Sequence, residues 1–178
     1  MADSSQKPKF TAAEIKQHIQ NIQKILDKTK SSSNSEIFMA LTPEQIEEKL
    51  KRVNSPMIIG SGWNNTVQGG TVNYSVTIFN PDPAQSLWLY FHVFVGSGNP
   101  DPVPGTFLLN VDTRFPRLTL PRNGLILASN ASAVLNFALK VPLTVEKTNY
   151  LGNGCLMKVT FNDTGLYLDR SVFPFEVA

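Results

Sequence analysis

The stretch from Leu87 to Val95 most constrains how this chain can fold, because it places large apolar side chains on both sides of one strand. Successive residues of a strand point to opposite faces. One face carries Leu87, Leu89, Phe91, Val93 and Val95, and the other carries Trp88, Tyr90, His92 and Phe94. Both faces need cover, so we expect a protein core on one side and a further partner on the other.

The preceding stretch, Thr71 to Ile78, is apolar on one side only. Val72, Tyr74, Val76 and Ile78 alternate with Thr71, Asn73, Ser75 and Thr77. This period of two is typical of a half-buried antiparallel strand. Asn80-Pro81-Asp82-Pro83 joins the two strands, and its residues are those that favour turns.

The rest of the chain from Pro56 to Ala178 shows the same alternation in short runs between turn residues. The runs are residues 57–59, 107–111, 118–120, 131–141, 155–161 and 171–177. No helical period separates them, and Pro174 marks the last run as an edge or bulged strand. The pattern predicts a mainly β fold, an Ig-like antiparallel β-sandwich of roughly seven to nine strands.

The first 55 residues differ from the rest and predict two amphipathic helices, about 11–30 and 42–54. Thr11 with Glu14, and Thr42 with Gln45, have the spacing of capping boxes. The apolar stripes that need a packing partner are Ile15, Ile19, Ile22 and Leu26 in the first helix and Ile46 and Leu50 in the second. We therefore expect a helical segment, 1–55, and a sandwich domain, 56–178. The residues between the helices, 37–40, fit either a helix extension or a loop.

Two of the sandwich runs support a resemblance to a known class of module. These are Gly-Gly-Thr-Val-Asn-Tyr-Ser-Val-Thr-Ile-Phe-Asn-Pro at 69–81 and Ala-Val-Leu-Asn-Phe-Ala-Leu-Lys-Val-Pro at 133–142, followed by a late strand with a cysteine. In this order they resemble bacterial Ig-like modules of the CARDB and fibronectin-III kind. The resemblance covers residues 56–178 and implies a module that binds proteins or glycans, or acts as a spacer.

The reactive side chains are few. The chain has one cysteine and two histidines, and Cys155 lies within a predicted strand on an expected core face. We therefore expect no catalytic residues, no metal site and no cofactor. The net charge of +2 gives no basic stripe for nucleic acid, and no apolar run is long enough to span a membrane. The N-terminus has no signal-peptide core, which favours a cytoplasmic location.

These observations favour a non-enzymatic module for protein interaction or structure, with a protein partner or self-association. The candidate interaction surface is Trp88, Tyr90, His92 and Phe94. Two alternatives stay open: a carbohydrate-binding or adhesin-like module that uses the same aromatic face, and an enzyme of unrecognised type. We also expect the helix stripes to cover this aromatic face, either within one chain or across two protomers.

Overall fold

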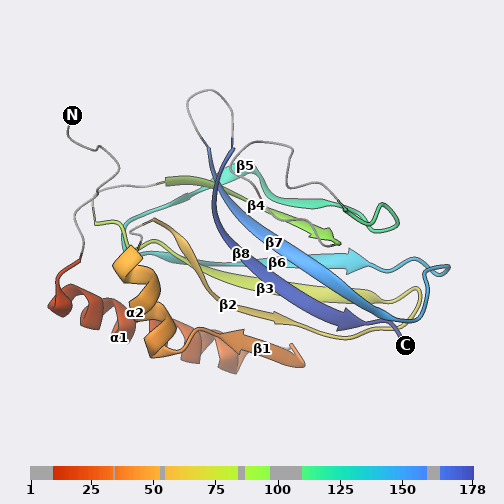
Figure 1. Ribbon diagram of the computed structural model, residues 1–178, viewed down its shortest axis with the longest axis horizontal. Coiled ribbons are helices and arrows are strands. Elements are labelled where there is room, and N and C mark those ends of the chain that lie inside the picture. The colour runs from red at the N-terminus through yellow and green to blue at the C-terminus, as the bar shows by residue number, and fades with distance from the viewer. Residues whose placement is uncertain (1–9, 34, 53–54, 84–86, 97–109, 160–164) are drawn as a thin grey trace.

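A computed structural model describes residues 10–33, 35–52, 55–83, 87–96, 110–159 and 165–178. The elements are α1 (Ala12–Ser32), β1 (Ile37–Ala40), α2 (Pro43–Arg52), β2 (Met57–Trp63), β3 (Thr71–Phe79), β4 (Leu87–Val95), β5 (Leu118–Leu127), β6 (Ser132–Lys140), β7 (Asn149–Val159) and β8 (Gly165–Glu176). The strands form two antiparallel sheets, β1-β2-β3-β6 and β5-β4-β7-β8 (Figure 1). This is the predicted Ig-like β-sandwich. The strand expected at Phe107 and Leu109 lies outside the described residues.

The core between the sheets contains the side chains that the alternation of β3 and β4 assigned to it. Val72, Tyr74, Val76 and Ile78 of β3 and the five inward residues of β4 are all buried there. Each large side chain contributes roughly 1.5 to 3 kcal/mol when buried. The two strands belong to different sheets, so the segment Asn80 to Pro83 begins a crossing between sheets. Its Asn80 side chain donates to the Leu127 carbonyl at 3.0 Å and accepts from the Asp82 amide at 3.1 Å.

Strand β7 has the opposite face assignment from the one we expected. Leu156 enters the sandwich core, whereas Cys155 and Met157 lie in a separate cluster with Phe94 of β4. The inward positions on either side of Asn153 are glycines. A Cβ on Gly152 would lie 2.2 Å from the Phe173 ring, and one on Gly154 would lie 2.6 Å from both Phe91 and the Tyr74 hydroxyl. The glycines therefore make room for neighbouring rings, and this obscures the apolar period.

Both helices begin at the predicted capping boxes. The Thr11 amide donates to Glu14 Oε1 at 3.0 Å, and the Glu14 amide donates to Thr11 Oγ1 at 3.2 Å. Thr42 and Gln45 make the same reciprocal pair at 2.9 and 3.2 Å. α1 ends two residues later than expected, at Ser32, and α2 is described as far as Arg52, while the last two positions expected for it, 53–54, lie outside the described residues.

The helices pack on the outer side of the β1-β2-β3-β6 sheet (Figure 1). Four stripe residues are buried there, Ile22, Leu26, Ile46 and Leu50, and two are partly buried, Ile15 and Ile19. The sheet contributes Met57, Ile59 and Phe79. Our expectation that the stripes cover the Trp88 face of their own sandwich is wrong. Met57 and Ile59 point outward on either side of the inward Ile58, and Phe79 points outward next to the inward Ile78, so the ordinary alternation of β2 and β3 creates this second apolar surface.

The segment between the helices is a strand, so the helical part is not a simple hairpin. β1 pairs with β2 from Ile37 opposite Trp63 to Ala40 opposite Gly60. Gly60 lets α1 approach closely, because a Cβ there would lie 2.8 Å from Leu26 Cδ2. Residues on both sides of position 55 thus share a sheet and an apolar cluster. The division into separate units at that position stays a prediction.

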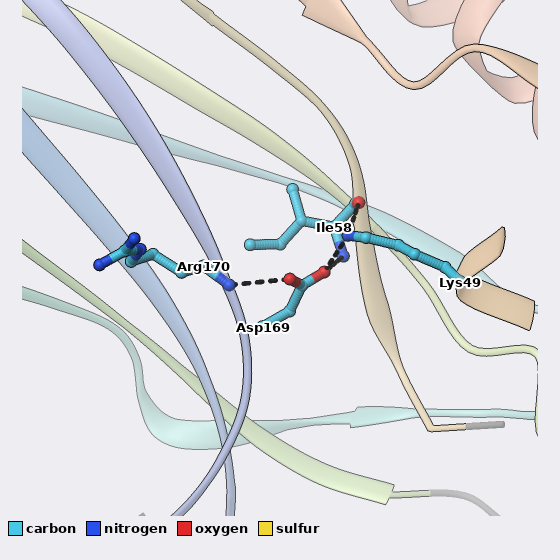
Figure 2. Close-up of polar contacts among 4 residues, drawn as sticks. All are labelled: Lys49, Ile58, Asp169 and Arg170. Atoms are coloured by element: carbon cyan, nitrogen blue, oxygen red, sulfur yellow. Dashed lines mark hydrogen bonds and ion pairs between the residues drawn. The ribbon is translucent and has the colours of Figure 1, made fainter. Parts of the chain in front are cut away.

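A polar link joins α2 to strands of both sheets (Figure 2). Asp169 Oδ2 accepts from Lys49 Nζ at 2.6 Å and from the Ile58 amide at 2.8 Å. Lys49 Nζ also donates to the Ile58 carbonyl at 3.3 Å, and Asp169 Oδ1 accepts from the Arg170 amide at 2.9 Å. The Asp169 side chain is only 17% exposed, so removing it leaves the Ile58 amide and the Lys49 ammonium without their anion.

We expect Asp169→Ala to lower the free energy of unfolding by about 2 to 3 kcal/mol, because charge-assisted hydrogen bonds are lost in a largely buried place. Urea denaturation measures the change. Glu48→Ala is the matched control, since Glu48 pairs with Arg52 in a largely exposed i,i+4 contact and its loss should cost under about 0.5 kcal/mol. Equal effects of the two substitutions would contradict the assigned role of Asp169.

The side chain of His18, on α1, is only 8% exposed. Its ring makes edge contacts with Phe10, at 4.9 Å between centroids, and with Phe79, at 5.8 Å. Nδ1 has no hydrogen-bond partner among the described residues. Burial lowers the pKa of His18 below its usual 6.5, and the nearby Glu14 carboxylate opposes this only in part.

The protein should therefore lose stability as the pH falls below 6.5. The unfolded chain binds a proton at His18 that the folded chain excludes, so the stabilisation is complete above the unfolded pKa and is lost below it. Urea denaturation at pH 7.5 and 5.5 should show a smaller loss for His18→Leu than for the unsubstituted protein. Burial lowers the pKa of His92 as well, so the His92→Gln variant is measured beside it and shows the pH dependence that remains when His18 alone is kept. The same pH dependence with and without His18 would exclude this role.

Candidate functional site

The candidate surface on β4 does not behave as one exposed face. Trp88 is 50% exposed, Tyr90 and His92 are partly buried, and Phe94 is 1% exposed. Exposure thus falls from Trp88 at the start of β4 to Phe94 near its end. The four residues do point to the side opposite the sandwich core, as their alternation predicts. Whether they form an interaction surface stays a prediction.

Phe94 belongs to a small cluster on this outer side of the sheet. It packs with the buried Cys155 and Met157, and Tyr90, Val111 and Tyr167 lie partly buried around them. Cys155 is fully buried, and burial raises the pKa of its thiol to about 12 although Arg170 acts in the opposite direction. A catalytic thiol needs a lowered pKa, so Cys155 fits a packing role.

His92 lies opposite Cys155 in the register of β4 and β7, which makes this pair the candidate for nucleophile and base. The ring Nδ1 is 2.9 Å from Thr119 Oγ1 of β5. Burial lowers the pKa of His92, so the ring is neutral near pH 7. The Cys155 thiol is buried and its raised pKa keeps it protonated, so this pair supplies no activated nucleophile and gives no support to the enzyme alternative.

Trp88 is held in one orientation by β5. Its Nε1 donates to the Asn123 carbonyl at 2.8 Å. The indole lies directly on Gly124, where a Cβ would be 1.7 Å from Nε1 and where φ is +77°. Opposite β4, residues 121–124 of β5 form an irregularity between the pairs Leu89–Leu125 and Phe91–Leu120. The bulge, which contains Asn123 and Gly124, therefore fixes a half-exposed ring.

Ile126 is a site residue that the sequence did not reveal. It pairs with Trp88 across β4 and β5 and is 67% exposed. Its position between Leu125 and Leu127 gives the only signal, because an apolar residue on the solvent side of an alternating strand is unexpected. We call Trp88, Tyr90 and Ile126 together the Trp88 surface.

Other kinds of site find little support in the described residues. In those ranges no three His, Cys, Asp or Glu side chains lie close enough together to hold a metal ion. Neither of the two described helices is long and apolar enough to cross a membrane.

No protein-family model matches the chain, and no curated protein matches its sequence. Among solved structures, the C-terminal domain of wzt is similar, with 9% identity, a TM-score of 0.51, and coverage of 82% of this chain and 80% of that one. A CARDB domain from Pyrococcus furiosus, in complex with di-metal ions, has 12% identity, a TM-score of 0.41, and coverage of 70% and 86%. A cohesin module of a Clostridium perfringens family 33 glycoside hydrolase has 12% identity, a TM-score of 0.38, and coverage of 70% and 96%. At fold level the chain resembles Ig-like β-sandwich modules.

Proposed function

We propose that this chain is a non-catalytic interaction module that binds a protein partner through the Trp88 surface. The observation that supports this most strongly is the half-exposed Trp88 ring, locked by Asn123 and Gly124. A large ring that is already fixed loses little conformational entropy on binding. Tryptophan is also among the residues that most often supply the binding energy of protein interfaces.

The energies are adequate for a specific contact. Trp88 and Ile126 lie directly opposite each other, so a partner can cover both with one apolar side chain or a short stretch. Burying the exposed parts of these two side chains contributes roughly 2 to 4 kcal/mol. This is the size of a small hot spot, which needs a surrounding rim to exclude water.

A protein partner fits this surface better than a sugar does. A sugar on an aromatic ring also needs side chains that can hydrogen-bond its hydroxyl groups. The nearest neighbour of Trp88 across the strands is the apolar Ile126, while His92 and Thr119 already contact each other. Carbohydrate binding at Trp88 is therefore the second outcome that the experiment must distinguish.

Trp88→Ala should weaken binding of a genuine partner by about thirtyfold or more, which corresponds to about 2 kcal/mol. Quantitative affinity purification with the full chain identifies candidates, and calorimetry with each purified candidate measures the affinity. Val172→Ala is the matched control, because Val172 is another exposed apolar residue, 44% exposed, on β8. Sedimentation analysis applies the same comparison to self-association.

Two results would contradict the proposal. One is that every purified partner binds the Trp88→Ala and Val172→Ala variants equally well. The other is that only glycans, and no protein, require Trp88, which would establish the carbohydrate alternative.

A further inference from the structure

A groove of about 700 Å³ lies on the other sheet, beside the end of α1. Its floor is formed by the outer faces of β3 and β6, and its wall by the last turn of α1 together with Ser33, Ser35 and Glu36. The volume is in the range of ligand sites in proteins. Nothing in the Trp88 surface contributes to it, so the two sites are independent.

The groove exists because the outward side chains of this sheet are apolar at one end of the strands and polar or small toward the other end. Met57, Ile59 and Phe79 at one end bind the helices. Toward the other end the outward positions of β3 are Asn73 and Ser75, and those of β6 are Asn136 and Ala138. These polar and small side chains give the helices nothing apolar to cover, so the sheet remains open beside α1.

The floor carries polar groups that the fold does not use. Ser75 lies directly opposite Asn136. Asn73 is the next residue of β3 on the same face, and it lies opposite Ala138. The side chains of these three residues make no hydrogen bond to another described residue. Asn64 fixes the floor from one end, since its Oδ1 accepts the Asn73 amide at 2.7 Å and its Nδ2 donates to the Thr71 carbonyl at 3.1 Å. The two free carboxamides can each donate and accept.

Two hydroxyl groups of the wall direct their protons into the helix. Thr29 Oγ1 donates to the Ile25 carbonyl at 2.8 Å, and Ser32 Oγ donates to the Lys28 carbonyl at 3.0 Å. Their remaining lone pairs can accept. Glu36 adds a carboxylate to the same lining. A ligand that fills the groove therefore meets acceptors at Thr29, Ser32 and Glu36 of the wall, and carboxamides that both donate and accept on the floor.

This pattern excludes several classes of ligand. The described residues of the lining include no Lys, Arg or His, and the groove lies at the negative end of the α1 dipole beside Glu36, so phosphates and other anions are disfavoured. Val134 and Ala138 are its main apolar side chains, because the Tyr74 and Phe137 rings lie in the sandwich core. An apolar ligand would gain little there. The floor offers only side chains to an extended peptide, because the backbone hydrogen-bonding groups of β3 and of the edge strand β6 lie in the plane of the sheet and the groove lies on its face.

We infer that the groove is a binding site for a neutral oligosaccharide. Hydroxyl groups of a sugar both donate and accept, which matches free carboxamides on the floor, hydroxyl lone pairs on the wall and one carboxylate. Asn73 and Asn136 are the main donors from the floor. Glu36 accepts from sugar hydroxyls at the wall.

The test begins with the full-length protein on an array of neutral and acidic glycans, followed by calorimetry with the neutral glycan that is best retained. We expect the double substitution Asn73→Ala and Asn136→Ala to weaken binding at least tenfold. Ala138→Phe should block the groove and abolish binding, because Ala138 is exposed on the edge strand β6 and the ring would project into the site. Asn149→Ala, an exposed asparagine on β7, and Trp88→Ala should bind normally. Circular dichroism confirms that each variant is folded.

Several results would overturn the inference. They are retention of no neutral glycan, retention of acidic glycans alone, and unchanged affinity in both groove variants. Binding that is lost with Trp88→Ala and kept in the groove variants would place the sugar on the Trp88 surface instead. The first three results leave the proposed protein interaction intact, because that interaction is measured with different variants and different ligands.

Discussion

The packing of α1 and α2 on Met57, Ile59 and Phe79 is the contact that determines where this protein can bind anything. Short amphipathic helices are marginal alone, so they must lie where the sheet offers apolar surface. The outward positions of β2 and β3 provide that surface on the β1-β2-β3-β6 sheet. The opposite sheet then keeps its own outer face free of the helices, and Trp88 remains half exposed.

The same packing explains the groove. α1 follows the apolar end of the sheet and ends at Ser32, so the wall of the groove is the end of a helix that is held in place elsewhere. Gly60 and Gly62 of β2 allow this close approach, since a Cβ on Gly62 would lie 2.5 Å from Ser35 Oγ. Weakening the helix contact should therefore change the shape of the groove while leaving the Trp88 surface unaltered. The ion pair between Lys49 of α2 and Asp169 of β8 also stabilises the packing of α2 on the sheet.

The alternation of the sequence was sufficient for most of the fold. It located β3, β4 and β6 nearly to the residue, and the capping boxes located both helix starts. The alternation failed where side chains or strands from elsewhere in the chain determine which residue faces the core or joins a sheet. Gly152 and Gly154 replace the apolar side chains expected on the inner face of β7, because rings from other strands fill their space. The strand β1 has only four residues and forms because β2 offers a free edge.

Alternation also predicted part of the candidate site, namely the direction of its side chains but not their burial. The outward direction of Trp88 follows from a period of two, whereas the burial of Phe94 depends on Cys155 and Met157, which we had assigned to the other face. Ile126 becomes visible only when β5 is paired with β4. The groove could not be predicted, because its wall and floor come from segments about 40 to 100 residues apart that the helix packing brings together.

Acrylamide quenching of full-length single-tryptophan variants tests the central claim that the helices leave the Trp88 surface uncovered. Trp63→Phe leaves Trp88, which is 50% exposed, and Trp88→Phe leaves Trp63, which is 4% exposed. We predict that Trp88 is quenched several times more efficiently than Trp63, with a constant close to that of a solvent-exposed tryptophan. Equal protection of the two tryptophans would show that something covers Trp88 and would contradict the account.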